Sequence, residues 1–295
     1  MHQPIRSNEA WCAMQGVAEA DAKSRIWMLD SGGLIAEGRE RKITEEKAQF
    51  AQSRSAAERA GVAGGCSLGD AVSALKPSCL IGAAGKGGVF TRDILQTMSQ
   101  SMPKLSDSNS CNGSGGGGGG RRCGVRGMRE SDTAAPIVLA LSNPTDNSEC
   151  SFQDAWDATD GRVVFAAGSP FPSINTDAGA IDCSQANNAL IYPGLGAAVI
   201  LSGATQIPQA FFLAAAHALA DEVTSEEGQT GLVVPPVKRI RDAAAAVSAR
   251  VCLEALKDGK ASERGNGAVM KEAQAVRSGS GSENALRGAI EEWRF

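Results

Sequence analysis

The chain has 295 residues, of which 42% are hydrophobic and 21% charged, and its formal net charge is -4. These proportions are ordinary for a globular protein with a sizeable core, and the weak negative charge gives no electrostatic basis for binding nucleic acid. No stretch approaches the roughly 18 consecutive apolar residues of a membrane span, so we expect neither a nucleic-acid nor a membrane partner.

The first residues and the cysteines also narrow the possibilities. Residues 1–24 lack the apolar core of a secretory signal and make a poor mitochondrial presequence, so we expect a helical or irregular segment there. The eight cysteines form no C-x-x-C pair, and His2 and His217 are the only histidines, so a zinc site is not expected. Cys79 and Cys252 lie in apolar segments, as is typical of buried free thiols in a reducing compartment.

Four short apolar runs predict β-strands, and helical patterns lie between them. The runs are residues 25–30, 78–82, 137–141 and 163–166. Runs this short and uniformly apolar are typical of strands covered on both faces in a parallel sheet. Helices are predicted at 68–75, 91–98 and 151–159. The alternation of strand and helix predicts an α/β fold with a doubly wound, Rossmann-like parallel sheet over residues 25–186.

A glycine-rich segment and a helical region follow different patterns. Residues 106–122 read SDSNSCNGSGGGGGGRR, and we expect a disordered insert over 106–130. From Tyr192 onward only helical patterns occur, which predicts a C-terminal helical segment over 187–258. The polar residues 259–295 predict a largely disordered tail with a short helix at 283–293.

Ligands of open α/β sheets bind beyond the carboxyl ends of the strands, so the residues that end each run are candidates. Asp30 ends the first run and is either an acceptor for the ribose hydroxyls of a dinucleotide or a solvated acid. Gly82, Gly85 and Gly87 follow the second run, where they either allow close approach of a ligand or form a tight turn.

Amide side chains follow the third run and precede the C-terminal helices. Asn143 stands before Pro144, which holds it in an extended conformation at the tip of the strand. It is either a binding amide or the start of a turn. Asn187 and Asn188 are likewise either turn-formers or binders of a carboxylate. No base and no cluster of acids stands at a strand end, so we assign no catalytic and no metal-binding residue.

Taken in order, the motifs IWMLD, LKPSCLIGAAGKGGVFT, ALSNPT, GRVVFAAGSPF, NNALIYPG and LVVPPVKRIRDAAAAVSARV carry a family resemblance. From about residue 25 to residue 256 the chain resembles the C-terminal, NAD(P)-binding half of malic enzymes. The resemblance implies oxidative decarboxylation of L-malate to pyruvate with NAD or NADP and with Mg²⁺ or Mn²⁺. It also implies a full-length homo-oligomer inside the cell, in the cytoplasm, mitochondria or plastids.

The same resemblance gives the candidate residues their roles. It implies that Asp30 lies near the adenosine ribose and that Gly82, Gly85 and Gly87 line the cofactor. Asn143 then lies close to both nicotinamide and malate. The amide pair that helps to hold malate corresponds to Asn187 and Asn188, and residues 187–258 correspond to helices that pack on the catalytic domain.

The resemblance also implies that part of the family's machinery lies upstream of the matched region. This part comprises the catalytic tyrosine and lysine, the metal-binding acids, and the first strand with its phosphate turn. We therefore expect an incomplete sheet in which residues 25–30 form the second strand. We expect the chain alone to fold poorly and to be inactive. The alternatives are a non-catalytic remnant that binds a nucleotide or a partner subunit, and a different dinucleotide-dependent dehydrogenase.

Overall fold

A computed structural model describes residues 18–102, 135–177, 179–262 and 264–293. The expected glycine-rich insert at 106–130 lies outside these residues. The chain divides into two compact units. We call Lys23–Gln185 with Ser225–Leu232 the sheet unit, and Met1–Ala22, Ala186–Thr224 and Val233–Phe295 the helical unit. The short helix α2 (Glu19–Ser24) spans the boundary between them.

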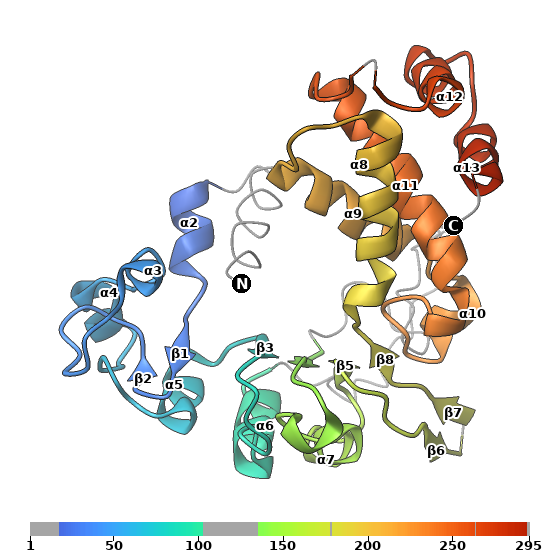
Figure 1. The fold of residues 1–295 in the computed structure, drawn as a ribbon. Helices are drawn as coiled ribbons and strands as arrows, with labels where there is room; N and C mark the ends of the chain where they lie inside the picture. The colour runs from blue at the N-terminus through green and yellow to red at the C-terminus, as the bar shows by residue number, and fades with distance from the viewer. Residues whose placement is uncertain (1–17, 103–134, 178, 263, 294–295) are drawn as a thin grey trace, which may run out of the picture. The chain divides into compact units, whose positions relative to one another are not determined.

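The sheet unit contains a parallel four-stranded sheet (Figure 1). Its order is β3 (Cys79–Gly82), β4 (Ile137–Ala140), β5 (Val164–Ala167) and β8 (Ser184–Gln185). In register, Cys79 pairs with Ile137, and Ile137 with Val164. The predicted α/β fold class with a Rossmann-like parallel sheet is confirmed. Three of the four predicted strands lie next to one another in it.

Helices cover one face of the sheet, and along β3 and β4 buried side chains therefore alternate with exposed or partly exposed ones. The helices of this unit that contribute to the shared core are α5 (Leu68–Leu75), α6 (Arg92–Gln100) and α7 (Phe152–Ala158), and α6 and α7 lie on the same side of the sheet (Figure 1). Leu80, Val138 and Phe165 point into this core, where the Phe165 ring stacks on Phe152 at 5.1 Å. Ile81 alternates outward from β3 and is 57% exposed.

The prediction that residues 25–30 form a strand of the parallel sheet is wrong. Only Leu29–Asp30 form a strand, β1, and it pairs antiparallel with β2 (Gly33–Leu34) in a separate two-stranded sheet. The cause is a tight reversal at Ser31–Gly32, followed by Gly33 with φ +82, where a Cβ would lie 2.1 Å from the Gly65 carbonyl oxygen. The two strands build a small core of their own, so β3 is an edge strand among the described residues.

Smaller elements complete the sheet unit. Helices α3 (Glu45–Ala48) and α4 (Arg54–Arg59) follow β2, and the 3-10 turn η1 (Thr145–Asn147) follows β4. A second antiparallel pair is formed by β6 (Ile174–Thr176) and β7 (Gly179–Ile181), and α10 (Ser225–Gln229) also belongs to this unit. The amide of Asp182 donates to the carbonyl of Thr230, which ties the segment after β7 to the segment after α10.

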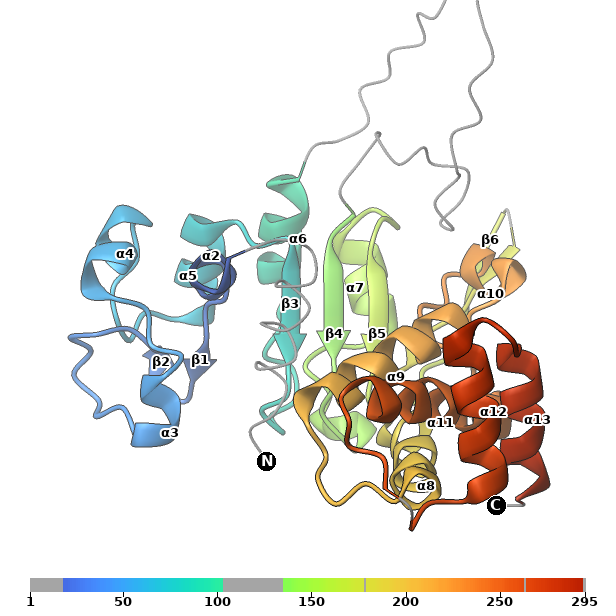
Figure 2. The same ribbon diagram turned by 90° about the horizontal axis from the view of Figure 1, so that it is seen from above.

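The helical unit is built around α11 (Ile240–Lys257), as Figure 2 shows from above. The 3-10 turn η2 (Asn188–Leu190) leads into α8 (Tyr192–Ser202), followed by α9 (Gln209–Asp221) and the turn η3 (Val237–Arg239). Gly194 allows α8 to approach α11, because a Cβ there would lie 2.6 Å from the Ala244 carbonyl oxygen. Ser248 of α11 donates to the Gly194 carbonyl over 2.8 Å.

The prediction of a largely disordered tail is wrong for the described residues. Helices α12 (Gly267–Ser278) and α13 (Glu283–Glu292) follow α11, the second where a short helix was predicted. Their polar composition hides two apolar pairs at helical spacing, Val269 with Ala273 and Leu286 with Ile290, all at most 1% exposed in the shared core. The side chain of Asn266 caps α12, and that of Ser282 caps α13.

Candidate cofactor site

Two loops leave the carboxyl ends of β3 and β4 and lie side by side. We call residues 83–88 the β3 loop and residues 141–148 the β4 loop. The Gly88 amide donates to the Ser148 carbonyl over 3.0 Å, and the Gly85 amide donates to the Ser142 hydroxyl over 2.9 Å. Just beyond the loops, Phe90 donates to the carbonyl of Glu149 over 2.9 Å. The two loops are therefore joined at the edge of the sheet where ligands of this fold bind.

A buried carboxylate joins the loops further. Glu149 is 0% exposed, and its side chain accepts the amides of Ala84 and Ser142, each at 3.3 Å. It also accepts the Ser142 hydroxyl. One side chain thus binds both loops where they leave their strands.

Glycine is present at the three predicted positions for different structural reasons. A Cβ on Gly82 would lie 2.4 Å from Cδ of Glu149, and one on Gly87 would lie 2.3 Å from the Asp146 carbonyl oxygen. The packing of the two loops therefore requires glycine at 82 and 87. Gly85 has φ +67 and no atom within 4 Å of its Cβ position, so its backbone faces open space where a ligand can approach.

Asn143 is an exposed residue of the β4 loop, and its amide is oriented by the segment that follows β5. Its Oδ1 accepts the hydroxyl of Ser169 over 2.7 Å, which leaves the NH₂ group as the available donor. Gly168 makes room for this arrangement, because a Cβ there would lie 2.3 Å from the Leu141 carbonyl oxygen and 2.9 Å from Nδ2 of Asn143. The Asn143–Pro144 peptide bond is cis.

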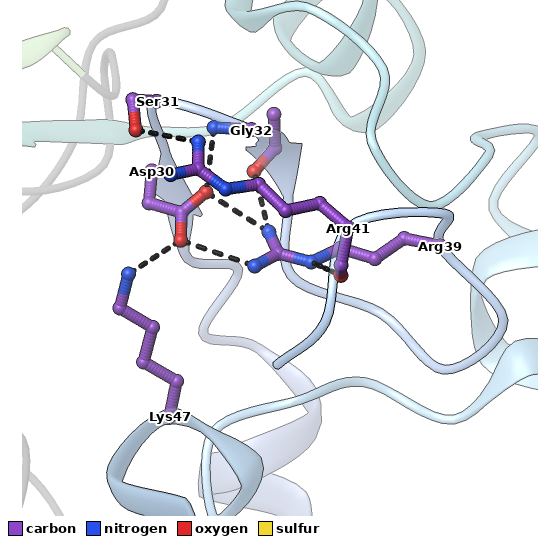
Figure 3. Close-up of polar contacts among 7 residues, drawn as sticks. Asp30, Ser31, Gly32, Arg39, Arg41 and Lys47 are labelled. Atoms are coloured by element: carbon purple, nitrogen blue, oxygen red, sulfur yellow. Dashed lines mark hydrogen bonds and ion pairs between the residues drawn. The ribbon is translucent and has the colours of Figure 1, made fainter. Parts of the chain in front are cut away.

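Asp30 lies at the centre of a cationic cluster (Figure 3). Its Oδ1 accepts the Gly32 amide at 2.8 Å and Nη1 of Arg39 at 2.9 Å. Its Oδ2 accepts Nη2 of Arg39 at 3.1 Å and the ammonium of Lys47. These four bonds occupy the roughly four lone-pair positions of a carboxylate. Donation from Arg39, with smaller contributions from Lys47 and Gly32, outweighs the opposing effect of burial and holds the pKa of Asp30 well below its usual range.

The members of this cluster differ in exposure. The Arg39 side chain is 1% exposed and is committed to Asp30, whereas Lys47 of α3 is 36% exposed. Arg41 is exposed and donates to the Ser31 hydroxyl over 2.8 Å. Arg39 and Lys47 pair with the one carboxylate, and the exposed part of Lys47 and the guanidinium of Arg41 are the cationic groups of this cluster that solvent can reach.

The structure brings the loop glycines and Asn143 together, but the second amide pair belongs to the helical unit. Asn187 accepts the Ala189 amide over 2.9 Å and caps η2, whereas Asn188 is exposed. Ser142, Glu149 and Ser169 were not predicted as site residues, although Ser142 lies in the motif ALSNPT, Ser169 lies in GRVVFAAGSPF and Glu149 follows ALSNPT closely. In the part of the chain that the structure describes, no group of three or more His, Cys, Asp or Glu side chains is placed to hold a metal ion.

A parallel sheet with joined glycine loops and an oriented amide at its carboxyl edge is the arrangement of a Rossmann-like domain. The sequence profile "Malic enzyme, NAD binding domain" matches residues 7–105 and 114–256. The chain belongs to the malic enzyme family.

Individual malic enzymes are similar to the chain in sequence. The chain is 34% identical over 241 residues to NADP-dependent malic enzyme 4, chloroplastic, of Arabidopsis thaliana, covering 82% of this chain and 31% of the relative. It is 33% identical over 238 residues to NAD-dependent malic enzyme 1, mitochondrial, of the same plant, covering 80% and 33%. The chain thus spans about a third of the length of these curated relatives.

The fold agrees with a solved structure. The crystal structure of Entamoeba histolytica malic enzyme matches with a TM-score of 0.53 at 18% identity, over 90% of this chain and 48% of that chain. A membrane-spanning helix is not found: none of the helices within the described residues is both long and apolar enough.

Proposed function

We propose that this chain is the cofactor-binding part of a malic enzyme that converts L-malate to pyruvate with NADP as the hydride acceptor. The observation that carries the proposal is the joined loop pair, which presents the open backbone at Gly85 and the oriented amide of Asn143 at the carboxyl edge of the sheet. Family membership supplies the reaction class.

The residues at this edge have the groups to bind and orient the ligands. The Asn143 NH₂ can donate to the carboxamide oxygen of nicotinamide or to a carboxylate oxygen of malate. The open backbone at Gly85 lets a flat ring approach closely. A bound nicotinamide would supply the acceptor for the hydride of C2 of malate. The described residues do not fit Mg²⁺ or Mn²⁺, so no metal-assisted step is assigned to them.

The choice of NADP rests on the cluster around Asp30. Because four donors occupy its acceptor positions, this carboxylate has none left for a ribose hydroxyl. Lys47 and Arg41 instead offer positive charge at the surface, where a 2′-phosphate would be attracted. In this proposal Asp30 acts by holding Arg39 and Lys47 in place.

Fluorescence titration of the full chain with NADPH and NADH tests the proposal. We expect tighter binding of NADPH by at least about tenfold, the equivalent of 1.4 kcal/mol. Lys47→Gln should raise the NADPH Kd by about 5- to 20-fold and leave the NADH Kd within about twofold. The size of the effect is that of one charged hydrogen bond, reduced because Lys47 is partly exposed. Lys271→Gln removes the same charge from an exposed position of α12 and should change neither Kd.

Two results would contradict this function. Equal loss of NADH and NADPH affinity in the Lys47 variant would remove the 2′-phosphate assignment, and a chain that binds neither nucleotide would remove the cofactor role. The assigned site residues include no proton-transferring base and no metal group. We therefore expect no malate-dependent NADPH formation by this chain, and turnover with Mn²⁺ would show that this expectation is wrong.

A further inference from the structure

Glu149 is a buried carboxylate without a cation to balance it. It is 0% exposed, and the described residues place no Lys, Arg or His side chain in an ion pair with it. Removing a carboxylate from water costs several kcal/mol, and a well-packed apolar residue of similar volume often stabilises a fold as well or better. The position of this charge therefore points to a purpose other than stability.

The three donors to Glu149 come from the two loops that form the candidate cofactor site. They are the Ala84 amide of the β3 loop and both the amide and the hydroxyl of Ser142 in the β4 loop. The Ser142 hydroxyl donates a hydrogen bond to the carboxylate, and its oxygen accepts the Gly85 amide over 2.9 Å. The chain of bonds runs in one direction, from Gly85 through Ser142 to Glu149.

This chain of bonds ends next to the binding amide. Ser142 immediately precedes Asn143, so holding the amide and the hydroxyl of Ser142 restrains the backbone that leads into Asn143. Ser169 holds the Asn143 amide from the other side over 2.7 Å. Gly82 completes the arrangement, because only a residue without Cβ leaves space for the Glu149 carboxylate.

We propose that Glu149 is a positioning residue that holds the open backbone at Gly85 and the amide of Asn143 as one preformed surface for the carboxamide-bearing half of a nicotinamide dinucleotide. This inference rests on the proposed function of the same site. Glu149 does not touch the ligand. It acts by removing the freedom of the two loops before the ligand arrives, which lowers the entropy cost of binding.

Amide hydrogen exchange on the full chain without ligand tests the positioning directly. Glu149→Gln keeps the shape but turns an NH₂ group toward N–H donors, so at least one loop contact must break. We expect exchange to be at least about tenfold faster either at the Ser142 amide or at the Ala84 and Gly85 amides, depending on which oxygen the glutamine keeps, while the Leu141 amide, bonded to the Gly82 carbonyl at 2.9 Å, stays within about twofold. Unchanged exchange at the loop amides would overturn the proposal.

Two further variants keep the test decisive. Ser142→Ala removes only the hydroxyl link and should speed exchange at Gly85 more than at Ala84, whose bond to Glu149 remains. Ser99→Ala removes a buried hydroxyl of α6 that accepts Nη2 of Arg162, in the segment between α7 and β5, over 2.6 Å, so it reports loss of an ordinary buried hydrogen bond. This control variant should leave the exchange rates of the Ala84, Gly85 and Ser142 amides unchanged.

A comparison of two ligands separates positioning from general destabilisation. NADPH carries nicotinamide, whereas 2′-phospho-ADP-ribose lacks it. Glu149→Gln should raise the NADPH Kd about tenfold and leave the Kd of the truncated ligand within about twofold. Equal loss for both ligands would mean that Glu149 has only a structural role. A wild-type chain that binds neither ligand would refute the proposed function, and the exchange measurement would then decide alone whether Glu149 fixes the loops.

Discussion

Replacing Asp30 by asparagine should destabilise the small core around β1 and β2 by about 2–4 kcal/mol. The side chain of Arg39 is 1% exposed, and breaking a buried pair of this kind typically costs 3–5 kcal/mol. The asparagine keeps one oxygen for Gly32 and Arg39, which reduces the loss. Its NH₂ group, however, faces the second Arg39 nitrogen and Lys47, both of which are donors.

Native-state hydrogen exchange measures this loss locally, which suits a chain with two units. The Ile35 amide donates to the Met28 carbonyl over 2.8 Å within this core. A loss of 2–4 kcal/mol predicts exchange about 30- to 700-fold faster at this amide. A double-mutant cycle with Arg39→Met should give a coupling of at least about 1.5 kcal/mol. The exposed pair Arg54–Glu58 is the matched control and should couple by less than about 0.5 kcal/mol.

The pH dependence provides a second check with a definite sign. Because the folded pKa of Asp30 is lowered, its contribution is fully present above the unfolded value of about 3.9 and is lost as pH falls through the folded value. The difference between wild type and Asp30→Asn should thus be constant above about pH 5 and shrink by about 1.4 kcal/mol per pH unit below about 3.9. A coupling under 0.5 kcal/mol, or a difference that grows on acidification, would refute the reasoning.

Three further predictions concern the loops, the tail and a thiol. Gly82→Ala should lower the free energy of unfolding in urea by about 1–3 kcal/mol because its methyl group overlaps the buried carboxylate of Glu149. Gly85→Ala has space for its methyl group and suffers only from the positive φ, so it should cost about 1 kcal/mol. Equal effects of the two variants would contradict the contact between Gly82 and Glu149. Leu286→Ala should cost about 2–4 kcal/mol and Ile200→Ala, at 63% exposure, less than about 0.5 kcal/mol; a silent Leu286 variant would show that α13 does not pack. Burial raises the pKa of the Cys252 thiol to about 12, so iodoacetamide at pH 8 should label it, by mass spectrometry, only after unfolding.

The strands of the parallel sheet were predictable because each coincides with a short apolar run. Residues 78–82, 137–141 and 163–166 are short and largely apolar, and each overlaps a strand of the parallel sheet. Residues 25–30 share that property, but apolar content does not say which sheet a strand joins. The reversal at Ser31–Gly32 decides this instead. In the tail, average polarity hid the few apolar positions that pack.

The site was predictable only in part because its key contact is long-range. The motif ALSNPT identified Asn143, and the glycine loop followed from its place after a strand. The contact between Glu149 and Ala84 spans 65 residues, so no local pattern reveals it. Two of the three loop glycines likewise owe their identity to the other loop rather than to a ligand.

The shared space of Gly82 and Glu149 has an evolutionary consequence. Any side chain at position 82 collides with the carboxylate, and any shorter residue at position 149 leaves an empty volume and unsatisfied loop amides. A single substitution at either position is therefore unfavourable while the other position keeps its residue. We expect the two to diverge together or not at all among relatives, as one inherited unit rather than as independent positions.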